Sequence, residues 1–225
     1  MTGQRPIVLA TRNPHKLREV RQILRAAGWD FDLRGLDQYP DAPDVPETAA
    51  TFADNAVAKA VAVAKHTGLV TVADDSGLEV DALGGRPGVM SNRFAGPGAD
   101  DAARIGKLLG MMRGVPRAKR TARFRCAAAV AAPAGDVTVV EGVAEGWIAE
   151  SPRGERGFGY DPAFVPRRHR RTFAQMTPAE KNRISHRAQA LSMLAARLRK
   201  ECKIQESSRR VRDPDFWIQQ HPKKP

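Results

Sequence analysis

The chain has 225 residues, of which 42% are hydrophobic and 28% charged, and these proportions are ordinary for a globular protein that buries a core. With no run of 18 apolar residues and no signal-like start, the sequence argues against a transmembrane helix and against export, and two distant cysteines argue against a disulfide framework. The cysteines also make a reducing cytoplasm the expected location. The formal net charge of +12 indicates either a nucleic-acid partner or a site for small polyanions together with a solvated basic surface.

Strands and helices are predicted to alternate in the first half of the chain. The apolar run 5–11 predicts a buried strand, and residues 13–28 predict a helix with asparagine and proline at its start and glycine at its end. A capping box at Thr51 predicts a second helix that ends at Gly68. Residues 69–73 then predict another buried strand.

The second half is predicted to be richer in strands. Helical spacing predicts a helix over 99–112, and two longer β segments, 122–132 and 136–149, are joined by a hairpin-like loop. A short strand is expected at 163–165, and a second capping box predicts one long helix over 177–200.

This order of elements favours an α/β fold, with an elongated mixed sheet and helices on both of its sides. We interpret residues 1–200 as a single domain. Residues 201–225 lack helical periodicity and are basic, so we expect a flexible C-terminal tail.

The first candidate site joins the first strand to the first helix. The amino end of a helix favours anions, and hydroxyl, amide and ammonium groups nearby would complete a phosphate-binding loop. An ordinary capped helix with a surface lysine explains the same residues. The loop consists of Thr11, Arg12, Asn13, Pro14, His15 and Lys16.

The second candidate is acidic. Asp74 and Asp75 are expected at the end of a strand, just before a tight turn with Ser76 and Gly77. Paired carboxylates suit Mg²⁺, and one of them could also act as a base toward water. Glu47 is a possible further ligand. A solvated acidic turn remains an alternative.

Two further segments carry aromatic and basic groups. Phe158, Gly159, Tyr160 and Asp161 form a loop that could stack on a purine, although a turn with core-packing aromatics would have the same composition. The last predicted helix carries Lys181, His186 and Arg187, which a basic solvated face would also explain.

The order of these motifs resembles the Ham1-like, or RdgB-like, family of non-canonical purine nucleoside triphosphate pyrophosphatases. The matching segments run from about residue 6 to 198: IVLATRNPHKLREV, ETAATFADNAVAKA, VADDSGLEVDALGGRPGVMSNRFAG, ERGFGYDPAFVP and TFAQMTPAEKNRISHRAQAL. The resemblance implies two lobes with a central cleft, Mg²⁺ as cofactor, a homodimer, and hydrolysis of dITP, ITP, XTP and dXTP to the monophosphate and pyrophosphate.

The resemblance also implies roles for individual residues. Thr11, Asn13 and Lys16 match triphosphate contacts, and Ser76 matches a further substrate contact. Asp75 matches the metal ligand and proton acceptor, with Asp74 and Glu47 as its acidic partners. The loop 158–161 matches the base-binding loop.

Lys181, His186 and Arg187 match groups that hold the nucleotide and select the 6-oxo group of the purine. Lysine and arginine offer only hydrogen-bond donors, so they would accept a 6-oxo group and disfavour the amino group of adenine.

The sequence departs from the family pattern at Asn92 and Gln175, which lie beside the matching motifs. A nucleic-acid-binding module would explain the basic charge but not the acidic group of Glu47, Asp74 and Asp75, so nucleic acid is not the expected partner. Other rivals are a pyrophosphatase for modified pyrimidine nucleotides, which the purine-directed basic residues disfavour, and an inactive paralogue, which the intact motifs disfavour.

Overall fold

A computed structural model of the chain describes residues 6–29 and 32–197. It contains a mixed six-stranded sheet in the order β2-β1-β3-β4-β5-β6. β1 pairs in parallel with β2 and β3, and the pairs from β3 through β6 are antiparallel. The strands are β1 (Pro6–Leu9), β2 (Asp32–Gly35), β3 (Thr71–Val80), β4 (Thr121–Ala131), β5 (Val137–Ile148) and β6 (Phe164–Pro166).

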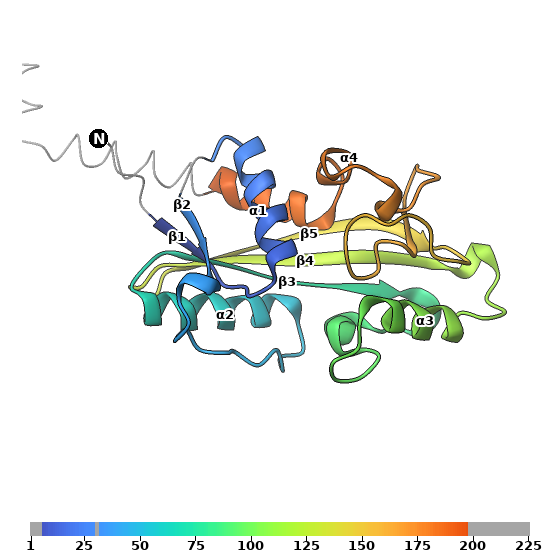
Figure 1. The fold of residues 1–225 in the computed structure, drawn as a ribbon, viewed down its shortest axis with the longest axis horizontal. Helices are drawn as coiled ribbons and strands as arrows, with labels where there is room; N and C mark the ends of the chain where they lie inside the picture. Colours follow the sequence, from blue (N-terminus) through green and yellow to red (C-terminus); the bar gives the residue numbers. More distant parts are fainter. Residues whose placement is uncertain (1–5, 30–31, 198–225) are drawn as a thin grey trace, which may run out of the picture.

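Helices flank both sides of this sheet, as Figure 1 shows, with α1 and α4 above the strands and α2 and α3 below them in that view. The named helices are α1 (Pro14–Ala26), α2 (Phe52–Thr67), α3 (Asp101–Met111) and α4 (Pro178–Asn182). A further helical run covers residues 186–197. The predicted α/β class with a mixed sheet is therefore confirmed. No helix in the described ranges is long and apolar enough to span a membrane.

Local sequence signals placed the first two helices correctly. The Asn13 side chain accepts hydrogen bonds from the backbone N–H groups of His15 and Lys16, and it begins α1. Thr51 accepts from the Asp54 N–H at the start of α2, and Gly68 ends that helix in the left-handed region. The predicted helix at 99–112 and the hairpin of β4 and β5 are also confirmed.

The predicted turn at Asp74–Gly77 was wrong. These residues lie inside β3 and pair with β4, with Asp74 opposite Ala128 and Asp75 opposite Ala127. Aspartate, serine and glycine favour turns, but the ladder with β4 overrides that local preference because the apolar alternation resumes at Leu78. The short strand β2 was not predicted.

The single long helix predicted over 177–200 was also wrong. α4 ends at Asn182, and the chain turns before a second helix begins at residue 186. The Ser185 hydroxyl accepts from the Ala188 N–H, so Ser185 caps this second helix. The break places His186 and Arg187 in the first turn of a new helix, where both are buried. The predicted tail, 201–225, lies outside the described residues.

Candidate active site

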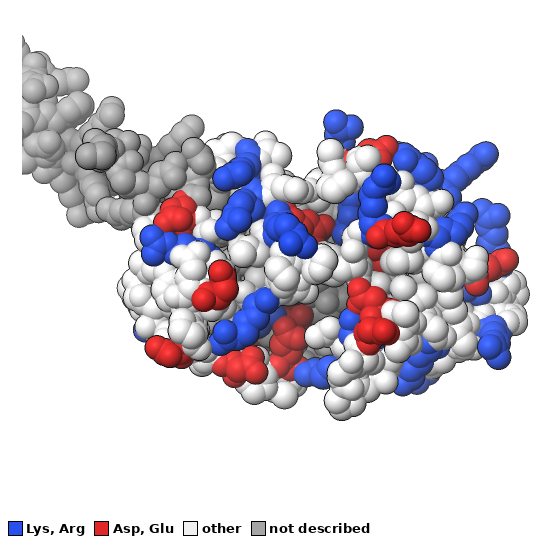
Figure 2. Space-filling model, in the orientation of Figure 1, with Lys and Arg blue, Asp and Glu red and all other residues white. Residues whose placement is uncertain are grey.

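A cleft with a cavity volume of about 640 Å³ is lined by residues from both halves of the chain. Figure 2 shows the hollow near the middle of one face, with acidic and basic side chains around its rim. Nearly all predicted site residues line it: Thr11, Arg12, Asn13, His15, Lys16, Glu47, Asp75, Ser76, Phe158, Gly159, Tyr160, Asp161, Lys181, His186 and Arg187. Two predicted residues, Pro14 and Asp74, are not among those that line it.

In the predicted phosphate loop, Asn13 caps the first helix as expected. The Thr11 hydroxyl accepts from the Asn13 N–H at 3.1 Å, and the side-chain Oδ1 of Asn13 accepts from the His15 N–H at 2.8 Å. The first N–H groups of α1 are therefore capped by the chain itself. The Lys16 ammonium lies 3.3 Å from Asp74 and also lines the cleft, so Lys16 and Arg12 are the positive charges that this loop places at the cleft wall.

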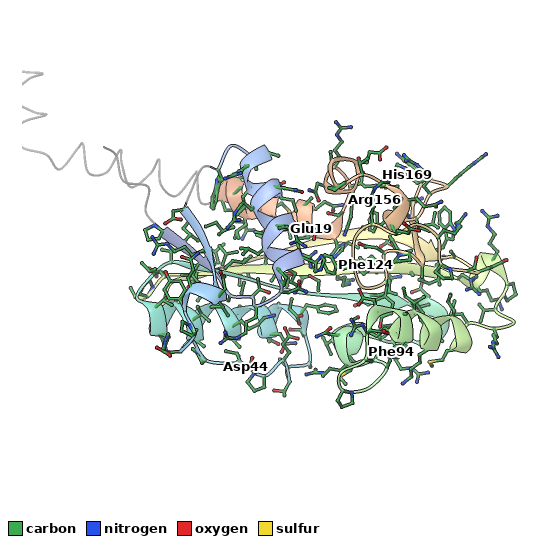
Figure 3. All side chains as sticks on the ribbon, in the orientation of Figure 1. Glu19, Asp44, Phe94, Phe124, Arg156 and His169 are labelled. Carbon is green, nitrogen blue, oxygen red and sulfur yellow. The ribbon has the colours of Figure 1, made fainter. Side chains whose placement is uncertain are left out.

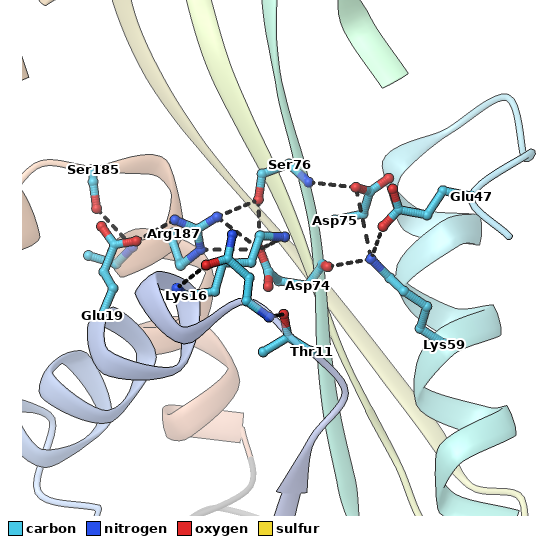
Figure 4. Close-up of polar contacts among 12 residues, drawn as sticks. Thr11, Lys16, Glu19, Glu47, Lys59, Asp74, Asp75, Ser76, Ser185 and Arg187 are labelled. Atoms are coloured by element: carbon cyan, nitrogen blue, oxygen red, sulfur yellow. Dashed lines mark hydrogen bonds and ion pairs between the residues drawn. The ribbon is translucent and has the colours of Figure 1, made fainter. Parts of the chain in front are cut away.

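Asp74 and Asp75 point to opposite faces of the sheet, because successive side chains of a strand alternate. Asp74 accepts from Arg187 Nε at 3.1 Å, Arg187 Nη2 at 3.0 Å and the Ser76 hydroxyl at 2.8 Å (Figure 4). Burial alone would raise the pKa of Asp74, but the charges of Lys16, Arg187 and Lys59 outweigh it and hold that pKa far below its ordinary value.

Asp75 faces α2 instead. The Asn55 side-chain amide donates to Asp75 Oδ2 at 2.9 Å, and burial raises the pKa of Asp75 above its ordinary value. Asp74 and Asp75 therefore do not form the joint carboxylate pair that the sequence predicted. Instead, one lysine lies between the carboxylates of Asp75 and Glu47.

That lysine is Lys59, which sequence reasoning missed. Its ammonium forms an ion pair with Glu47, donates to the Asp74 carbonyl at 2.7 Å and lies 4.0 Å from Asp75 Oδ1 (Figure 4). Lys59 follows Asn55 by one helical turn of α2, so both residues face β3. That spacing was the signal available in the sequence, but a lysine on an alanine-rich helix is more often solvated.

Behind the cleft lies a second charged network, centred on Glu19 of α1. Glu19 is buried and forms ion pairs with Lys181, at 3.1 Å, and with Arg187. Lys181 also lies 2.7 Å from Asp161. Burial alone would raise the pKa of Glu19, but Arg187 and Lys181 outweigh it and lower that pKa. Glu19 was missed because only the fold brings α1 beside residues 181–187.

The aromatic loop is held from two directions. Asp161 Oδ2 accepts from the Phe158 N–H at 3.0 Å, and a Cβ at Gly157 would collide with the same carboxylate. The Tyr160 hydroxyl donates to the Ser91 carbonyl at 2.9 Å. The Phe158 ring lines the cleft with the Lys181 ammonium 5.0 Å from its centroid. The loop thus presents an aromatic ring at a fixed position beside a positive charge.

His186 forms part of the cleft wall together with Phe124. Their rings are stacked, with centroids 4.6 Å apart and an interplanar angle of 9°. His186 is buried, and burial together with Arg187 and Lys181 lowers the pKa of His186 well below its ordinary value, so the ring is neutral. Phe124, labelled on the sheet in Figure 3, was not predicted as a site residue.

Asn92 and Gln175, the two residues that depart from the family motifs, lie in different places. Asn92 lines the cleft, and its carbonyl accepts from Arg104 Nη1 at 3.0 Å. Gln175 instead caps a short helical turn by accepting from the Thr172 N–H at 3.0 Å, and it is not among the residues that line the cleft.

The donor set beside Lys59 fits a hard divalent cation. It offers two carboxylates, from Glu47 and Asp75, and the Asp74 carbonyl, all of them oxygen ligands of the kind that Mg²⁺ prefers. Among the described residues, no group of three or more His, Cys, Asp or Glu side chains converges on one point. Water and the phosphates of a substrate would therefore supply the remaining ligands of such a cation.

The mixed sheet brings carboxylates, buried cations and an aromatic loop together around one cleft. A cleft of this kind defines a protein that binds a ligand with an aromatic ring and several negative charges. The Ham1 family matches residues 7–197 of the chain. The chain therefore belongs to the Ham1 family.

Curated relatives and solved structures agree with this membership. The chain is 53% identical over 188 residues to a dITP/XTP pyrophosphatase of Geobacillus kaustophilus, covering 84% of this chain and 91% of the relative. It is 49% identical over 188 residues to a dITP/XTP pyrophosphatase of Bacillus subtilis, covering 84% and 94%. A HAM1 protein structure from Coxiella burnetii matches with a TM-score of 0.78 at 43% identity, covering 87% of this chain and 99% of that one.

Proposed function

We propose that this protein hydrolyses the triphosphates of non-canonical purines, dITP, ITP, XTP and dXTP, to the nucleoside monophosphate and pyrophosphate. The observation that carries the proposal is the arrangement of one cleft, in which the Phe158 loop and the group of Asp75, Glu47 and Lys59 all line the same cavity. Such a cleft can hold a base at one end and a triphosphate at the other. The relatives at about half identity carry the same activity in their names.

In this proposal Asp75 is the catalytic residue. Its Oδ2 accepts from Asn55, and its Oδ1 accepts from the Ser76 N–H at 2.9 Å and lies 4.0 Å from the Lys59 ammonium. An ionised Asp75 would orient the attacking water and accept its proton. Glu47 and Asp75 would hold Mg²⁺, which when bound would neutralise phosphate charge and polarise the phosphorus. Lys16 would balance the charge of the triphosphate.

Asp74 has a different proposed role from the one that the sequence indicated. Its carboxylate contacts Arg187 and Lys16 on the face of β3 opposite to Asp75, so we propose this carboxylate as a positioning group instead of a metal ligand.

Purine selection would take place at the end of the cleft opposite to the proposed metal and triphosphate site. Phe158 would stack on the base, and stacking accepts any purine. Lys181 and Arg187 contribute only donors, which favour a 6-oxo group over an amino group. Their ion pairs with Asp161, Glu19 and Asp74 fix where those donors point.

The test measures pyrophosphate release from dITP, XTP, dGTP and dATP, with and without Mg²⁺. We expect fast Mg²⁺-dependent release from dITP and XTP, and a loss of about 100-fold or more in Asp75→Asn. Asp41→Asn serves as the control and should retain activity, because Asp41 is an exposed residue in the loop between β2 and α2. Equal turnover of dATP would contradict the selectivity, and full activity of Asp75→Asn would contradict the assigned base.

The homodimer and the cytoplasmic location remain predictions, as does the division into a domain over 1–200 and a tail. Light scattering of the purified chain measures its mass, and twice the monomer's 24.6 kDa is the expected result.

A further inference from the structure

Lys59 occupies the place among the acidic oxygens that a divalent cation would take. Its ammonium contacts Glu47 and the Asp74 carbonyl, and it lies 4.0 Å from Asp75 Oδ1. We propose that Lys59 is a built-in counter-ion which a metal must displace, so that the nucleotide-free protein binds divalent cations weakly and the nucleotide enables metal binding. This inference rests on the proposed function, because it assumes that Glu47 and Asp75 hold the metal.

The burial of this group explains why a cation is needed there. The side chains of Lys59, Glu47 and Asp75 are 12%, 29% and 7% exposed. Two neighbouring carboxylates that are shielded from water repel each other, and a buried ammonium requires acceptors. Lys59 satisfies both requirements at once, so the free protein is stable without a metal in this place.

The same charge opposes a metal. A divalent cation bound by Glu47 and Asp75 would lie next to the Lys59 ammonium, and like charges at such distances repel strongly where water is scarce. Metal binding therefore requires the ammonium to leave. Asp75 does not need to move, because Asn55 fixes its other oxygen at 2.9 Å.

The lysine has somewhere to go only when a polyanion enters. It lies on the wall of the cleft, and its four-carbon stem can swing while its helix stays in place. Phosphate oxygens would give the displaced ammonium new partners, and the incoming nucleotide would supply ligands to the metal. Nucleotide and metal should therefore bind with strong mutual cooperativity.

The experiment follows free Mn²⁺ by its electron paramagnetic resonance signal during titration of the metal-free full chain. The probe nucleotide is a dITP analogue with a methylene bridge between its α and β phosphorus atoms. After subtraction of the Mn²⁺ that the analogue binds without protein, we expect the wild type to bind Mn²⁺ at least about tenfold more tightly with the analogue present than without it. Without the analogue, Lys59→Met should bind Mn²⁺ about tenfold more tightly than the wild type.

Lys65→Met is the matched control, because Lys65 is an exposed lysine on the last turn of the same helix. It should titrate like the wild type. If Lys59→Met binds Mn²⁺ no more tightly than Lys65→Met, the lysine is a structural bridge only and the inference is overturned.

Two further results separate this inference from the proposed function. The wild-type titration alone decides the matter if Lys59→Met does not melt cooperatively, since equal Mn²⁺ affinity with and without the analogue would overturn the inference. A wild type that releases pyrophosphate from dITP while showing that equality would retain its proposed function and lose only the role of Lys59.

Discussion

Arg120 is buried, with only 5% of its surface exposed, yet it does not belong to the cleft. Its guanidinium donates to the carbonyl of Met112 at 2.9 Å, of Ile148 at 2.8 Å and of Ala149 at 2.9 Å. These carbonyls lie where α3 and β5 end, so one side chain satisfies backbone acceptors from two elements. A buried carbonyl without a donor costs about 1–3 kcal/mol.

Removing this arginine should therefore destabilise the fold. We expect Arg120→Met to lower the free energy of unfolding by about 2–4 kcal/mol, because at least one carbonyl would stay without a donor after relaxation. Urea denaturation followed by circular dichroism measures the change. Arg117→Met, at an exposed position three residues earlier, should change it by less than about 0.5 kcal/mol. Equal effects of the two substitutions would show that the carbonyl contacts contribute little.

At the scale of elements, the sequence predicted what local chemistry determines. Asn13 and Thr51 begin their helices as expected because a cap involves only residues within one turn. A strand was predicted over 69–73, but its continuation through Asp74 and Asp75 was not, because the pairing with β4 depends on residues about 50 positions away. Side-chain propensity within a short segment cannot report such a ladder.

The candidate site shows the same contrast between features that the local sequence determines and features that depend on distant residues. The predicted residues that line the cleft were found because their motifs occur in a recognisable order. Glu19 was not found because its partner Arg187 is distant in sequence. Lys59 was not found because a lysine on an alanine-rich helix is more often solvated, whereas here it pairs with Glu47 across the loop before α2. Buried ion pairs of this kind exist only once the fold has brought two segments together.

The start of α3 is connected directly to the aromatic loop. Asp101 Oδ2 accepts from the Gly159 N–H at 2.6 Å, while its other oxygen pairs with Arg104. Gly159 has a φ of 62°, in the left-handed region that favours glycine. The position of the loop that would hold the base therefore depends on one carboxylate of α3.

Asp101→Ala should loosen that loop without altering the catalytic carboxylate. We expect the KM for dITP to rise about 5- to 20-fold while kcat changes less than about threefold, because base binding weakens and the Asp75 group is untouched. Steady-state kinetics of pyrophosphate release provide the measurement. Asp101→Asn keeps an acceptor oxygen and should recover most of the lost affinity. A kcat loss as large as the KM effect would instead place Asp101 in the chemistry.

At the scale of the whole molecule, the long strands bring the parts of the cleft together. β3, β4 and β5 have 10, 11 and 12 residues, and they run through the length of the molecule in Figure 1. Three apolar clusters pack around them, one with α1 and residues 188–195, one with α2 and one with α3. Because β3 sends Asp74 to one face and Asp75 to the other, a single strand connects the network behind the cleft to the proposed metal group.

The net charge of +12 is a property of the whole molecule. It attracts a nucleoside triphosphate, which carries about four negative charges. Exposed arginines lie along the loops next to the aromatic segment, among them Arg153, Arg156 and Arg168, and Figure 3 labels Arg156 there. Figure 2 shows Lys and Arg side chains gathered over this end of the face. A surface of this kind attracts anions over distances of about a Debye length, roughly 10 Å at 0.1 M salt.

We therefore expect kcat/KM for dITP to fall about three- to tenfold between 25 and 250 mM KCl, roughly estimated from screening of long-range attraction, while kcat stays nearly constant. Changing Arg153, Arg156 and Arg168 together to Gln should make the salt dependence shallower. The control removes the same charge at Arg113, Arg117 and Lys119, which are exposed and do not line the cleft, and should leave the slope nearly unchanged. Equal slopes for both triple variants would mean that total charge, and not its position beside the aromatic loop, attracts the substrate. A salt-sensitive affinity for single-stranded RNA that both triple variants abolish would instead favour nucleic acid as the partner of the basic surface.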